Sequence, residues 1–159
     1  MKHDKALRRQ VVELLRSKHA HVDLEGALAD LPPRLRGKKP KGAQHTVWQL
    51  LEHIRLGQWD ILEFSRNPKH VSPKWPEGYW PKTEAPPSAA AWNTSLRKIR
   101  ADQKAMEKLV ESEKSDLLAL IPHGTGQTLL REALLAADHN AYHIGQIVLL
   151  RRLLGNWKS

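Results

Sequence analysis

The chain has 159 residues, a formal net charge of +9 and no cysteine. A chain of this length is typical of one domain with a buried core, so we expect residues 1–159 to form a single domain. The lack of cysteine excludes disulfides, thiolate metal sites and a cysteine nucleophile. No apolar run reaches the roughly 18 residues of a membrane span, and the charged start predicts no signal peptide. We therefore expect a cytoplasmic protein without membrane contact.

The first predicted helix covers residues 4–17, where apolar side chains recur at helical spacing and basic residues occupy the other side. Asp23 is a candidate N-cap for a second segment that reaches Leu31. The prolines at 32–33 end that segment. A single bent helix over residues 4–31 is the alternative.

The densest positive charge lies in residues 34–41 (RLRGKKPK). This run could contact phosphates, or it could be a solvated loop between helices. No aromatic side chains interleave with it for base stacking, and it precedes no obvious recognition helix. We favour the solvated loop, and a nucleic-acid partner is not expected.

A second helix is predicted to start after Thr46, because Thr46 and Gln49 fit a capping box. It should end near Arg66, before an Asn-Pro pair. Gly57 is unusual inside a helix, where it costs roughly 1 kcal/mol relative to alanine. It lies one turn beyond His53. Close approach of another helix or a ligand explains the glycine, and plain tolerance explains it equally well.

Residues 67–87 contain six prolines together with Trp75, Tyr79 and Trp80. The prolines exclude a helix and disfavour a central strand. Disordered segments are poor in aromatic residues, so we expect an ordered loop lying across one end of a helical bundle. Its aromatics could cover a pocket, but we favour the interpretation that they cap the core.

The third predicted helix begins at Ser88 and runs to about Ser112, with apolar residues at spacings of four and three. Gln103 interrupts that seam, either because it faces a site or because it bonds another helix. The last helix has Thr128 as its N-cap and ends before Gly155, a plausible C-terminal glycine.

The strongest functional signal is a pair of histidines four residues apart in the last helix. His139 and His143 lie on one helix face, one turn apart, within reach of a single ion. Nine histidines give about 0.5 such pairs by chance, so the pair alone is a weak signal. His53 of the second helix could complete a three-histidine site.

Three imidazoles suit zinc or nickel, with iron or manganese as alternatives. Three protein ligands leave one position for substrate, as catalytic sites do and structural zinc sites do not. The metalloprotease helix motif is absent, because Asn140 stands where its glutamate would be. Asp138 could act as a partner or base beside the site. His45 lies about 12 Å before His53 along a helix, too far to bind the same ion directly.

Four segments resemble the DinB-like proteins of the DinB/YfiT superfamily. These are residues 44–54 (QHTVWQLLEHI), 58–64 (QWDILEF), 75–81 (WPEGYWP) and 138–146 (DHNAYHIGQ). The resemblance spans residues 21–157. It implies an all-α, up-down-down-up four-helix bundle, often dimeric, with a long proline- and aromatic-rich loop between helices two and three.

The same resemblance implies a divalent metal held by one histidine of the second helix and two of the last, here His53, His139 and His143. Characterised relatives include S-transferases and isomerases that use bacillithiol, mycothiol or glutathione. We therefore expect a homodimeric, metal-dependent S-transferase or hydrolase with a small-molecule substrate, and a low-molecular-weight thiol as a candidate co-substrate. No catalytic base is identified.

Two other hypotheses come from different classes. One is a helical interaction module in which the histidines are structural, and it predicts no stoichiometric metal. The other is a nucleic-acid-binding protein that uses residues 34–41, and it predicts salt-dependent binding.

Overall fold

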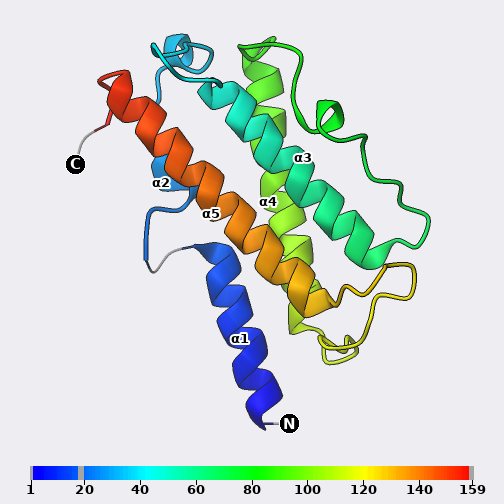
Figure 1. The fold of residues 1–159 in the computed structure, drawn as a ribbon. Helices are drawn as coiled ribbons and strands as arrows, with labels where there is room; N and C mark the ends of the chain where they lie inside the picture. Colours follow the sequence, from blue (N-terminus) through cyan, green and yellow to red (C-terminus); the bar gives the residue numbers. More distant parts are fainter. Residues whose placement is uncertain (1, 18–19, 158–159) are drawn as a thin grey trace.

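The computed structural model describes residues 2–17 and 20–157 of the chain, and it is all-helical there. Four long helices form a bundle (Figure 1). The helices are α1 (Lys2–Arg16), α2 (Leu24–Leu28), α3 (Val47–Arg66), α4 (Ala89–Glu111) and α5 (Leu129–Leu153), with short 3-10 turns η1 (Pro33–Leu35) and η2 (Glu77–Tyr79). Within the described ranges, none of these helices combines the length and apolarity needed to cross a membrane.

The long helices run up, down, down and up, as the family resemblance implies. Helices α3 and α4 start at the same end, where the rings of Trp48 and Trp92 lie 6.3 Å apart. The end of α4 lies beside the start of α1, where Arg8 Nη1 donates to the carbonyl oxygen of Val110 at 2.7 Å. Helix α5 returns in the opposite direction next to α3 (Figure 1). Helices α3 and α4 are therefore parallel to each other.

The predicted helix ends are largely confirmed, because the capping residues act as expected. Thr46 Oγ1 accepts from the backbone of Gln49 at 3.2 Å, and the Gln49 side chain accepts from the backbone of Thr46 at 3.0 Å. Ser88 and Thr128 cap α4 and α5 in the same way. Gly155 has a φ of 66°, the left-handed conformation that a glycine adopts after a helix.

The N-terminal region corrects one prediction. Helix α1 ends at Arg16, and Ser17 has a φ of 52°, so a single bent helix over 4–31 is wrong. Asp23 caps α2 as expected, accepting from the backbone of Gly26 at 2.9 Å. This helix ends at Leu28, before the predicted Leu31.

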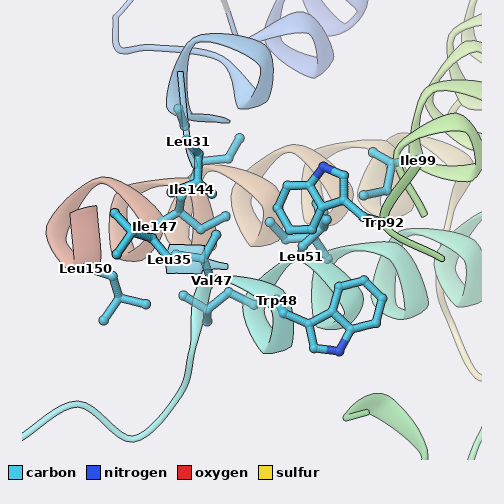
Figure 2. Close-up of a cluster of buried hydrophobic side chains, with 13 residues drawn as sticks. Leu31, Leu35, Val47, Trp48, Leu51, Trp92, Ile99, Ile144, Ile147 and Leu150 are labelled. Carbon is cyan, nitrogen blue, oxygen red and sulfur yellow. The ribbon is translucent and has the colours of Figure 1, made fainter. Parts of the chain in front are cut away.

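The core divides into two apolar clusters, and the histidines lie between them. The cluster at the start of α3 is shown in Figure 2. Its buried members are Ala27, Leu31, Leu35, Val47, Trp48, Leu50, Leu51, Ile54, Trp92, Ile99, Ile144, Ile147 and Leu150. The other cluster contains Val11, Val12, Leu15, Ile61, Leu62, Met106, Val110, Leu117, Leu129, Ala133, Ala136 and Ala137. Both α3 and α5 contribute to the two clusters, and between the clusters the histidine side chains of α3 and α5 lie next to each other.

The connection between α3 and α4 runs back along α3, and not across one end of the bundle as predicted. Asp60 of α3 accepts from the hydroxyl of Tyr79 at 2.6 Å and contacts His70 Nε2 at 2.7 Å. Farther along, Trp48 Nε1 donates to Thr83 Oγ1 at 3.1 Å. Since α3 and α4 are parallel, the chain must cover the length of a 20-residue helix, about 30 Å, before α4 can begin.

Candidate metal centre

The structure brings His53, His139 and His143 together at the middle of the bundle. His53 Nε2 and His139 Nε2 lie 3.2 Å apart. One ring nitrogen from each of the three histidines can be chosen so that all lie within 4.8 Å of one another. The three rings come from two helices, α3 and α5, that pack side by side.

This arrangement fits a small divalent cation. Two nitrogens bound to one tetrahedral ion at about 2.0–2.1 Å are themselves roughly 3.3 Å apart. The distance between His53 Nε2 and His139 Nε2 is close to that value. Imidazole nitrogens are ligands that zinc, nickel and iron accept. The three side chains could therefore hold one such ion with a fourth position left for another ligand.

The loop fixes the orientation of His53. The carbonyl oxygen of Tyr79 can only accept, so His53 Nδ1, at 2.9 Å, donates to it and Nε2 keeps its lone pair. The indole of Trp80 lies flat on the His53 ring, with centroids 4.0 Å apart and an interplanar angle of 2°. His45 stacks on Trp80 at 3.9 Å. Trp80 packs against the core, as the favoured interpretation predicts, and it also covers His53, whereas Trp75 is 69% exposed.

Hydrogen bonds also hold the other two rings. His143 Nδ1 lies 2.8 Å from Gln146 Oε1, one turn farther along α5. His139 Nδ1 lies 3.4 Å from Asn140 Oδ1, a long contact. Sequence reasoning missed both amides as partners of the histidines. The spacing of three residues between His143 and Gln146 could have predicted the first contact. No sequence signal pointed to the contact between Asn140 and His139.

Burial keeps the three histidines neutral. It lowers the pKa of His139 to about 4, with a smaller lowering from His53 and an opposing contribution from the bond to Asn140. Burial likewise lowers the pKa of His143 to about 4, against the bond to Gln146. The pKa of His53 is also lowered by burial, although the bond to Tyr79 opposes the shift. At neutral pH the rings therefore carry lone pairs that can bind a cation.

Gly57 is explained by close approach of His139. A β-carbon built at Gly57 would lie 2.7 Å from His139 Cε1 and 3.1 Å from His139 Nε2. Real side chains do not approach so closely, so only glycine leaves room for this imidazole. The glycine reflects the packed ring of His139, not plain tolerance.

Other candidates from the sequence have different roles. Asp138 is exposed and borders a surface hollow against α1, so it does not support the histidines. The acidic residue next to His53 in the sequence, Glu52, pairs with Arg55 at 2.8 Å. Gln103 does not face the site, because its side chain donates to the carbonyl oxygen of Leu15 at 3.3 Å.

Part of the basic run at 34–41 makes internal contacts. The guanidinium of Arg36 lies over the ring of Trp92, 4.2 Å from its centroid, and Lys39 forms an ion pair with Glu84. These contacts favour the loop interpretation, because two of the cations already have partners within the chain.

A family model described as the DinB superfamily matches residues 16–147, most of the chain. No curated protein and no solved structure matches it.

Proposed function

The chain belongs to the DinB superfamily, and we propose that it is a metal-dependent enzyme with His53, His139 and His143 as the ligands. The observation that carries this proposal is the convergence of three ring nitrogens within 4.8 Å. A metal with three protein ligands retains an open coordination position, which catalysis needs and a structural site lacks.

The ligand set favours an anionic co-substrate. All three imidazoles are neutral, so the full positive charge of a divalent ion would remain uncompensated by the protein. Bound there, such an ion would lower the pKa of a low-molecular-weight thiol and hold it as the thiolate. We infer a thiol-dependent S-transferase: the thiolate sulfur forms a bond to an electrophilic carbon, the leaving group departs with its electron pair, and the thiol proton passes to solvent.

A surface hollow offers room for a small molecule, and it is lined by neighbours of the three histidines but by none of the three themselves. Its volume is about 410 Å³, within the range of small-molecule sites. His45 and Gln146 lie on its wall, and these residues also contact Trp80 and His143. Leu50, Leu149, Leu150 and Leu153 form an apolar side, and Lys41 adds a cation. The hollow therefore suits a small molecule, either the electrophile or the thiol, that has an apolar part to contact the leucines and a negative charge to pair with Lys41.

Metal content is the first test. We would measure it by elemental analysis in wild-type protein purified without added metal, in the triple variant His53→Ala, His139→Ala, His143→Ala, and in the control His21→Ala, which removes an exposed histidine. We expect about one divalent ion per chain in wild type and control and none in the triple variant. Absence of metal even after incubation with zinc or nickel would refute the proposal and favour the interaction module.

The reaction is tested by screening thiols with electrophiles on zinc-loaded protein. Consumption of both thiol and electrophile, lost in the triple variant, supports the transferase. Turnover without thiol would identify a hydrolase instead, and activity retained in the metal-free variant would exclude the ion from the mechanism. The homodimer that the family resemblance implies stays a prediction, which sedimentation equilibrium tests.

A further inference from the structure

Two buried amide side chains connect the candidate metal centre to the backbone of α4. Gln58 of α3 is 2% exposed and Asn140 of α5 is 9% exposed. Gln58 Nε2 donates to the carbonyl oxygen of Ile99 at 2.7 Å, and Asn140 Nδ2 donates to Gln58 Oε1 at 2.7 Å. Asn140 in turn contacts His139 through Oδ1. We call Gln58 and Asn140 the amide chain.

The hydrogen bond from Gln58 to the carbonyl oxygen of Ile99 fixes the direction of every other hydrogen bond in the amide chain. A backbone carbonyl can only accept, so Gln58 must turn its amino group toward Ile99. Its oxygen then faces Asn140, which must offer its own amino group. The oxygen of Asn140 is therefore the atom left to face His139. Turning either amide around would place two acceptors or two donors against each other in the core, where an unsatisfied polar group costs about 1–3 kcal/mol.

This polarity favours a proton on one particular nitrogen of His139. Facing an oxygen that only accepts, Nδ1 is favoured as the N–H donor, and Nε2 is then left with a lone pair directed at His53 Nε2, 3.2 Å away. In metal-free protein His53 favours the opposite form, because its own Nε2 lone pair would accept a hydrogen bond from an N–H group at His139 Nε2. The amide chain and His53 thus compete for the tautomer of His139.

We propose that Gln58 and Asn140 are positioning residues that hold His139 in the tautomer that can bind metal. The inference rests on the proposed metal site and deepens it. Partners of this kind typically change metal affinity ten- to hundredfold when they are lost. A purely structural role would change stability without changing the tautomer or the affinity.

The test compares Asn140→Leu, Asn140→Asp and Gln58→Leu with wild type. The first and third replace an amide by an apolar side chain of similar size. Asn140→Asp keeps an oxygen facing His139 but sets a second acceptor against Gln58 Oε1, so it should lower stability without changing what His139 faces. Gln103→Leu is the matched control, because it removes an amide that bonds a backbone carbonyl away from the histidines. Two quantities are measured: zinc affinity by competition with a chelator, and the His139 tautomer in zinc-free protein by imidazole nitrogen NMR at mildly alkaline pH. Thermal unfolding checks that each variant is folded.

We expect Asn140→Leu to weaken zinc binding ten- to hundredfold and Gln58→Leu about tenfold, with Asn140→Asp closer to wild type and Gln103→Leu unchanged. In zinc-free Asn140→Leu, the His139 proton should move from Nδ1 toward Nε2. Folded Asn140→Leu with wild-type zinc affinity and tautomer would overturn the proposal. So would a wild-type His139 that is already protonated at Nε2. If wild type binds no zinc, the proposed function fails, and the NMR result still decides the role of the amide chain.

Discussion

Replacing Gly57 by alanine perturbs the candidate metal centre without substituting any of the three histidines. The new β-carbon would lie 2.7 Å from His139 Cε1, whereas ordinary van der Waals contacts begin near 3.4 Å, so the ring must retreat by about 0.7 Å. Metal–nitrogen distances in a sound site vary by only about 0.2 Å. A shift of this size removes His139 from the ligand set, and we expect zinc affinity to fall about tenfold or more.

The fold should survive the same substitution. Overpacking a core site costs about 1–3 kcal/mol, and replacing glycine by alanine in a helix returns roughly 1 kcal/mol. The free energy of unfolding of Gly57→Ala should therefore drop by about 0–2 kcal/mol. A fall in zinc affinity in a variant that is still fully folded therefore distinguishes displacement of His139 from general damage.

Zinc titration and urea unfolding of the same samples measure both effects. Gly145→Ala is the matched control, because Gly145 also lies inside a helix but a β-carbon there would meet nothing within 4 Å. It should gain roughly 1 kcal/mol of stability and bind zinc as wild type does. Wild-type zinc affinity in folded Gly57→Ala would refute the reasoning, because the imidazole would then have moved without consequence or not at all.

Three further predictions concern stability. The pKa values of His139 and His143 are about 4 in the fold and 6.5 for an unperturbed histidine, so the unfolded chain binds more protons between these pH values. Metal-free protein should therefore lose stability as pH falls from 6.5 to 4, by up to about 1.4 kcal/mol per pH unit for each histidine. If the variant His139→Gln, His143→Gln showed the same dependence of unfolding free energy on pH as wild type in urea unfolding, this prediction would be contradicted. Arg8→Met should lower the free energy of unfolding by about 2–4 kcal/mol in thermal or urea unfolding, because Arg8 donates to three backbone carbonyls at the end of α4 and just beyond it. Asp60→Ala removes the acceptor for Tyr79, so limited proteolysis should cut residues 67–87 faster than in wild type, and an unchanged rate would show that other contacts hold the loop.

Helix boundaries were predictable because their signals are local. Thr46 and Gln49 lie three residues apart and satisfy each other, whatever surrounds them. The histidine pair was equally accessible, since four residues of separation place two side chains on one helix face. His53 could be proposed as the third histidine from its place in a helix, but 86 residues separate it from His139, and the family resemblance was needed to favour it.

The path of the loop and the amide chain were not predictable in the same way. Where residues 67–87 lie depends on whether α3 and α4 are parallel, which no pattern inside the loop expresses. Asn140 and Gln58 are 82 residues apart, and each alone is only a polar residue on a helix. Gly57 was partly predictable. A glycine inside a helix is unusual in the sequence, but only the structure shows that it makes room for the His139 ring.

The stack between Trp80 and His53 gives the molecule an optical reporter of its own. An excited indole loses emission to a neighbouring imidazolium, so the fluorescence of Trp80 depends on the charge of the ring that it covers. His45 stacks on the same indole, so acidification should quench Trp80 through both rings, and a cation that occupies the His53 lone pair should remove the contribution of His53 alone. Subtracting the emission of a Trp80→Phe variant isolates this signal from the other five tryptophans. Occupancy of the site can then be followed in real time without a label.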